Sequence, residues 1–184
     1  MMLKWIMEAP AGWLLILGAF ILSGWMARSL AARVTNPTAQ YAGLGLYVVA
    51  EAVIFLPLLH VAAFYSSPKV IPMAAVLTAV LFTALTAVVF VTRKDFSFLR
   101  TFLVVGGMIA LGLIVCGVAF GFNLGLAFSG GMIVLAGAAI LYDTSKVLHH
   151  YQTNQHVAAS LELFASVALL FWYVLRILMI LNRR

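Results

Sequence analysis

Two acidic residues stand out in a stretch that is otherwise almost entirely apolar, residues 130–176. Asp143 precedes a short polar hinge and Glu162 follows it, and each lies a few residues inside a long apolar run. An ionised carboxylate at the centre of a membrane helix costs about 2.5–3.5 kcal/mol on insertion scales, so an acid kept there is a functional candidate. The structural alternative is that each acid is protonated, or hydrogen-bonded to a hydroxyl, and only fixes a pair of helices.

The spacing of these acids predicts that they lie at one level of an antiparallel hairpin. Asp143 would be about six residues, or roughly 9 Å, inside one helix end, and Glu162 about five residues deep on the next helix. Ser166 lies one turn deeper than Glu162 on the same face. Two carboxyl groups brought close would not both ionise, so a shared proton or a cation could hold them together. The pattern therefore predicts a gate that responds to protons or cations.

Two further charged residues are candidates for the same path. Arg28 ends the first predicted helix on the same side of the membrane, and it is the candidate basic partner by depth alone. Glu51 lies near the middle of the second apolar run and could be a further step on the path.

Other kinds of chemistry find little support in the chain. The hinge histidines, His149, His150 and His156, have no regular ligand spacing, so we interpret them as solvated residues, with pH sensing as the second interpretation. No serine hydrolase constellation, HExxH motif, P-loop or dinucleotide motif is present. An intramembrane protease would need two acids in a catalytic dyad, and Asp143 and Glu162 are not an obvious pair for that. We therefore do not expect an enzyme or a required cofactor.

Composition indicates where such acids would reside. The chain has 184 residues, of which 65% are hydrophobic and only 9% are charged, whereas a soluble domain carries about 25% charged residues. The class is therefore a polytopic α-helical membrane protein, since the apolar runs are continuous and barrel strands would alternate. The net charge of +6 does not indicate a nucleic-acid partner, because basic residues sit singly or in pairs at helix ends and fit lipid headgroups.

Apolar runs bounded by turn residues predict six transmembrane helices in a single domain, residues 1–184. Their approximate bounds are 12–33, 40–65, 70–92, 98–122, 125–149 and 157–182. The first, third and fifth loops carry six lysines and arginines against four on the other side, which places those loops in the cytoplasm. That topology puts both termini outside, and one more upstream helix would bring the N-terminus inside.

Three segments resemble the Bax inhibitor-1 family. ILYDTSKVLHH, followed after a short gap by AASLELFASVALLFWYVLRIL, resembles the family's C-terminal signature. TRKDFSFLRTFLVVGG and GLGLYVVAEAVIFLPLL resemble an earlier loop and the segment before it. The resemblance covers about residues 12–181, and it implies seven helices, with six around a central C-terminal one. The last helix here is thus expected to be central, and by order the family's first helix is the absent one, through shortening or an internal start methionine.

The same resemblance implies a pH-sensitive calcium leak that depends on two aspartates on the last two helices and a nearby arginine. Asp143 matches the first aspartate and becomes the candidate contact for Ca²⁺, the expected transported ion. The downstream LLFWYVLRIL segment places Ser166 at the second aspartate, with Glu162 as a candidate substitute. Family members are also linked to stress protection and to modulating membrane proteases. The alternative function is therefore a non-transporting modulator that contacts a membrane protease or another membrane protein. In a bacterium we expect the inner membrane, and the oligomeric state stays open.

Overall fold

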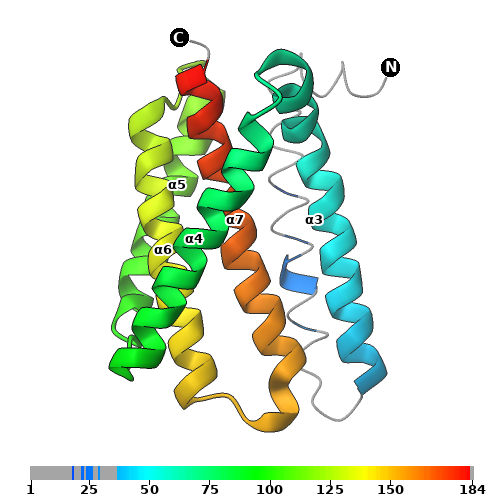
Figure 1. Cartoon of the computed structure of the whole chain (residues 1–184), viewed down its shortest axis with the longest axis vertical. Helices are drawn as coiled ribbons and strands as arrows, with labels where there is room; N and C mark the ends of the chain where they lie inside the picture. The colour runs from blue at the N-terminus through cyan, green and yellow to red at the C-terminus, as the bar shows by residue number, and fades with distance from the viewer. Residues whose placement is uncertain (1–17, 19–21, 23, 27–28, 30–36, 183–184) are drawn as a thin grey trace.

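A computed structural model describes residues 18, 22, 24–26, 29 and 37–182 of the chain (Figure 1). The first predicted helix, 12–33, lies outside the described residues apart from a few positions. The remaining helices have these bounds: α3 Pro37–Tyr65, α4 Val70–Thr92, α5 Leu99–Phe120, α6 Leu126–His149, the short 3₁₀ helix η1 Thr153–Gln155, and α7 His156–Asn182. The predicted all-helical class is confirmed, and the described part of the chain contains no strand.

Five of the described helices are long and apolar enough to cross a membrane. Their ends lie within about three residues of the predicted ones, because apolar runs and turn residues determine both. The ends also follow local backbone geometry. Arg93 ends α4 in a left-handed conformation, with φ of 49°, and donates its N–H to the Val89 carbonyl at 2.8 Å. The predicted extension of α5 to residue 122 is wrong, because Gly121 adopts φ of 71°, which glycine tolerates and a helix cannot continue.

The helices form an up-and-down bundle in which α7 is the central element, as predicted (Figure 1). Helix α7 packs against α6, α4 and α3, and the α6–α7 contact is the most extensive in the bundle. Its buried side chains meet those of the three neighbours in one core cluster. The buried members of that cluster are Leu58, Ala62, Val70, Ala74, Ala136, Ile140, Leu170, Val174, Leu175 and Met179. Small alanines on α3, α4 and α6 let the central helix approach closely.

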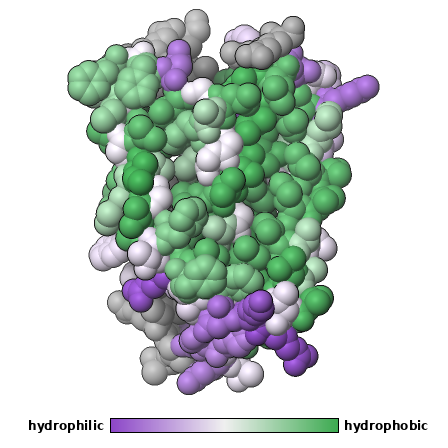
Figure 2. Space-filling model, turned by 90° about the vertical axis from the view of Figure 1, so that its left-hand side faces the viewer, coloured by the Kyte–Doolittle hydropathy of each residue, from purple (hydrophilic) through white to green (hydrophobic). Residues whose placement is uncertain are grey.

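The outer faces of the bundle are apolar. Figure 2 shows a broad hydrophobic band with hydrophilic residues gathered at its lower end. Large side chains such as Val91 and Phe120 are fully outward-facing, which a water-soluble surface would not tolerate at this density. The exposed Arg93, Lys94 and Asp95 lie in the loop between α4 and α5. Together with the five apolar helices, this surface indicates an integral membrane protein.

Candidate functional site

The α6–α7 hairpin carries the acids that the sequence singles out. Its helices run antiparallel, so residues that approach one another have sequence numbers with a nearly constant sum. Asp143 of α6 accordingly meets Ser166 of α7, and Lys146, three residues farther along α6, meets Glu162. Both pairs lie in the half of the bundle that holds the α6–α7 connection, one about a helical turn beyond the other.

The deeper pair joins Asp143 to Ser166. The Ser166 hydroxyl donates a hydrogen bond to Asp143 Oδ2. Ser166 is 6% exposed, and its neighbour Ala168 is also buried, so the contact lies within the helix interface. A buried carboxylate loses hydrogen bonds from water, and the serine hydroxyl replaces one of them. The pair therefore fastens α6 to α7 at the position where the family resemblance expects two aspartates.

The outer pair is an ion pair between Lys146 and Glu162. Lys146 Nζ lies 2.7 Å from Glu162 Oε2 and 3.0 Å from Oε1, so the ammonium bridges both oxygens. The side chains are 26% and 23% exposed, respectively, so water screens this pair less than it screens a surface pair. The lysine charge offsets the glutamate charge at the end of the membrane-spanning segment.

Aromatic side chains surround the lysine of this outer pair. The Lys146 ammonium lies 5.5 Å from the Tyr142 ring centroid and 5.3 Å from that of Tyr151, which are cation–π distances. Tyr151 lies in the α6–α7 connection, outside the spanning helices. Burial first, then a hydrogen bond to Glu162 and the nearby negative charge, raise the pKa of the Tyr151 phenol. The phenol thus stays protonated and can donate to the glutamate.

The loop between α4 and α5 closes the same end of the bundle. The Phe96 N–H donates to Ser145 Oγ at 2.9 Å, and the Ser145 hydroxyl donates to Asp95 Oδ1 at 3.4 Å. Hydrogen bonds from the Ser97 hydroxyl and N–H hold the pKa of Asp95 below its ordinary value, with a smaller contribution from the nearby His150. This network connects α6 to the exposed polar face of the bundle.

The hinge histidines contact separate partners. One ring nitrogen of His149 lies 3.2 Å from the Arg93 carbonyl oxygen, and His150 Nε2 lies 3.9 Å from Asp95 Oδ2. His156 Nε2 lies 3.1 Å from the Tyr41 hydroxyl oxygen. Within the described ranges, no group of three side chains could hold a metal ion.

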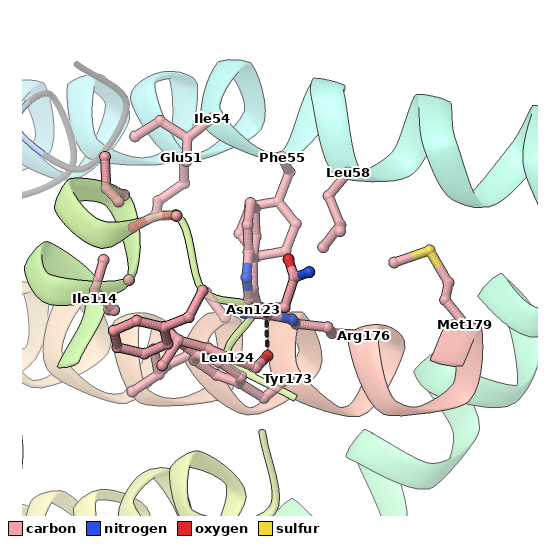
Figure 3. A pocket seen from close by; sticks show the side chains of 17 residues that line it. Glu51, Ile54, Phe55, Leu58, Ile114, Asn123, Leu124, Tyr173, Arg176 and Met179 are labelled. Carbon is pink, nitrogen blue, oxygen red and sulfur yellow. Dashed lines mark hydrogen bonds between the residues drawn. The ribbon is translucent and has the colours of Figure 1, made fainter. Parts of the chain in front are cut away.

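Glu51 does not join this hairpin site. Glu51 lies in α3 and lines a cavity on the opposite half of α7 (Figure 3). Arg28 lies outside the described residues, so its role as basic partner stays a prediction. Lys146 is the residue that sequence reasoning missed, since it counted there only as one of the six lysines and arginines assigned to the first, third and fifth loops. The antiparallel register could have revealed it, because a hairpin that pairs Asp143 with Ser166 also brings Lys146 close to Glu162.

The chain is similar to proteins of a known family. The model of the family described as "Inhibitor of apoptosis-promoting Bax1" matches residues 1–183. Bax inhibitor 1 of Schizosaccharomyces pombe is 33% identical over 177 residues, which are 95% of this chain and 64% of that protein.

Bacterial relatives match a shorter stretch. The modulator of FtsH protease YccA from Escherichia coli is 36% identical over 116 residues, 59% of this chain and 50% of that protein. A membrane protein of Vibrio cholerae is 33% identical over 122 residues, 66% of this chain and 54% of that protein. The chain thus spans about half the length of these bacterial relatives. The match over nearly all of its residues shows that the chain belongs to the Bax inhibitor-1 family.

Proposed function

We propose that this chain is a non-enzymatic membrane protein that modulates a membrane protease through contacts within the bilayer. The name of the Escherichia coli relative, a modulator of FtsH protease, supports the partner class. The observation that carries the proposal is that both hairpin acids are occupied by donors of the same chain. Ser166 donates to Asp143, and Lys146 binds both oxygens of Glu162.

These hydrogen bonds and this ion pair argue against a hydrolytic enzyme. A hydrolytic acid dyad needs two carboxyl groups that share a proton over one substrate bond. Here a hydroxyl stands opposite the first acid, and an ammonium neutralises the second. The arrangement instead favours a rigid hairpin that presents constant outer faces to another membrane protein.

Reconstitution with a protease tests the proposal. The chain and an FtsH-type membrane protease would be placed in the same liposomes, and the half-life of a membrane substrate measured. We expect the half-life to change several-fold in proportion to the amount of chain. The double variant Lys146→Met/Asp143→Asn, which loosens the hairpin, would lose the effect, whereas Thr83→Val, at an exposed hydroxyl that bonds only within α4, would keep it. An unchanged half-life at molar excess of the chain would contradict modulation.

A second candidate function is a pH-dependent cation leak, which the family resemblance implies. The observation that favours it is the position of Asp143, about two turns inside α6 and in contact with another helix. Protonation of that carboxylate would remove the negative charge that accepts the Ser166 hydrogen bond, and the helix contact would change. The Lys146 charge reduces the attraction of this site for Ca²⁺, which prefers six to eight oxygen ligands.

Calcium flux into liposomes distinguishes this second function. Wild type, Asp143→Asn and Ser166→Asp would be compared at several pH values. A leak through the hairpin predicts pH-dependent flux that Asp143→Asn abolishes. Ser166→Asp, which supplies the second aspartate, would increase it. Equal flux at every pH in all three proteins would exclude the leak.

A further inference from the structure

A cavity of about 630 Å³ lies on the opposite half of the central helix from the hairpin acids (Figure 3). Its walls come from α3, the end of α5, the α5–α6 connection and α7. Most of its lining is apolar, and its polar side chains are Glu51, Asn123, Tyr173 and Arg176. The volume falls within the range of pockets that hold single small molecules, about 300–1,000 Å³.

Glu51 is the unusual member of this lining. It is 1% exposed, and neither carboxylate oxygen has a hydrogen-bond partner among the described residues. Tyr47, one turn earlier on α3, interacts with this carboxyl group, although no donor lies at hydrogen-bonding distance and angle from either oxygen among the described residues. Figure 3 shows the Glu51 side chain directed into the cavity. Buried polar groups in proteins are almost always satisfied, so an acid that faces a cavity without a partner indicates a missing donor.

Arg176 supplies the opposite charge at another part of the same cavity. Its Nη2 donates to the Leu124 carbonyl oxygen at 2.8 Å, which anchors the side chain against the α5–α6 connection. A guanidinium has five N–H donors, so this bond leaves others for an acceptor in the cavity. Among the described residues, Glu51 and Arg176 form no ion pair with each other. The cavity thus holds an acid and a base that do not neutralise one another.

Aromatic rings line the space between these charges. Phe55 lies one turn after Glu51 on α3, and its ring meets that of Trp172 edge to face, with centroids 5.1 Å apart. Phe55 also stacks on Phe171 at 5.8 Å, which restrains its ring. Such faces attract an ammonium group and also accept an alkyl chain.

From these groups we propose that the cavity binds a zwitterionic amphiphile with a primary ammonium and an anionic group. The ammonium donates to Glu51, the phosphate or carboxylate accepts from Arg176, and the apolar part lies along Phe55, Leu58 and Met179. The ligand balances both charges and supplies the donors that Glu51 lacks. A bare divalent cation fits less well, because Glu51 alone offers two oxygens and the described residues place no second acid in the lining. This site is independent of the function proposed for the hairpin.

Lipid binding to the purified full chain tests the proposal. Three palmitoyl lysophospholipids would be titrated in detergent micelles and followed by native mass spectrometry. Lysophosphatidylethanolamine carries the primary ammonium, lysophosphatidylcholine has no N–H donor, and lysophosphatidylglycerol has no amine. We expect saturable binding of the ethanolamine lipid, at least about tenfold tighter than of either other lipid, as a charged hydrogen bond implies. Equal affinity for all three, or no saturable binding, would overturn the proposal.

Variants locate the site. Glu51→Gln and Arg176→Gln should each weaken binding of the ethanolamine lipid at least about tenfold. Asp95→Asn, which removes an exposed carboxylate outside the cavity, should bind like wild type. Unchanged affinity in a folded Glu51→Gln protein would refute the assignment, and the comparison of the three lipids on wild type holds even if that variant does not fold. O-phosphoethanolamine, the headgroup alone, separates the sources: binding as tight as that of the lipid indicates a soluble zwitterion, and weaker binding indicates a membrane lipid.

Discussion

The acids that lie beside the two halves of the central helix α7 have opposite surroundings. In the hairpin half, Asp143 accepts from Ser166 and Glu162 is bound by Lys146. In the cavity half, Glu51 is more deeply buried than Glu162, yet both its oxygens lack a partner among the described residues. The charged Arg176 lies in the same lining without pairing to it.

This difference distinguishes acids that stabilise the fold from an acid that is available to bind a ligand. A carboxylate that is matched by donors of its own chain contributes to the helix interface, and its removal leaves a donor unmatched. A buried carboxyl group without donors destabilises the fold, and it persists where a ligand supplies the missing interactions. The same type of residue should therefore respond to substitution with opposite signs in the two halves.

The largest effect should come from breaking the outer pair. Lys146→Met removes the ammonium and leaves Glu162 partly buried without its counter-charge. We expect the free energy of unfolding in mixed micelles to fall by about 2 kcal/mol, less than for a fully buried pair because both side chains are about a quarter exposed. The double variant Lys146→Met/Glu162→Gln should recover much of that loss. Lys69→Met, at an exposed residue before α4, is the control, and a loss of similar size there would show that the pair is not responsible.

The inner pair should have a smaller effect. Ser166→Ala removes the donor to Asp143, and hydrogen bonds between membrane helices contribute about 0.6–2 kcal/mol. We expect unfolding to become easier by about 1 kcal/mol. Ser129→Ala is a matched control. Ser129 is also buried, but its hydroxyl donates to the carbonyl oxygen of Gly125 at the start of its own helix, α6. If both variants lose the same stability, the cross-helix bond contributes nothing specific.

The cavity acid should change stability in the opposite direction. Glu51→Gln replaces a carboxyl group that has no donors with an uncharged amide that is easier to bury. Without added lipid, we expect the free energy of unfolding to rise by about 1 kcal/mol. Added lysophosphatidylethanolamine should stabilise wild type, and the variant should need at least about tenfold more lipid for the same stabilisation, as thermal denaturation at several lipid concentrations would reveal. Equal stabilisation of both proteins at the same lipid concentrations would place its binding elsewhere.

The smallest effect should appear at alkaline pH in the hairpin half. The raised pKa of Tyr151 means that the unfolded chain loses this proton at lower pH than the folded one. The contribution of the protonated Tyr151 phenol to the free energy of unfolding is therefore fully present below the ordinary tyrosine pKa of about 10 and declines as pH rises above it. Tyr151→Phe should show a weaker alkaline loss of stability than wild type. Tyr65→Phe, at an exposed residue ending α3, should follow the wild-type curve.

The sequence predicts the helices well and the contacts unevenly. Long apolar runs determine the spans, and the central position of α7 follows from the family resemblance. The predicted register placed Asp143 level with Glu162, and this was wrong by about one turn, because Asp143 meets Ser166 and Glu162 meets Lys146. Only the alignment to the family signature pointed to Ser166. The Lys146–Glu162 pair was missed, since a long flexible side chain can reach several partners or snorkel to the headgroups.

The surroundings of Glu51 were the hardest to foresee. Glu51 lies at the middle of α3, and its depth in the membrane stays a prediction. Most of its cavity, however, is lined by residues of the end of α5, the α5–α6 connection and α7, which begin at Ile114 and lie more than sixty positions away in the chain. Only the packing of the helices shows that Arg176 shares this space and that no described residue satisfies the acid.

One paired measurement tests the contrast most directly. Glu162→Gln and Glu51→Gln make the same chemical change in the two halves, and the free energy of unfolding of each would be compared with wild type in lipid-free micelles. We expect Glu162→Gln to destabilise the protein, because Lys146 loses its partner, and Glu51→Gln to stabilise it. A loss of stability of similar size in both variants would show that the two acids do not differ in this way.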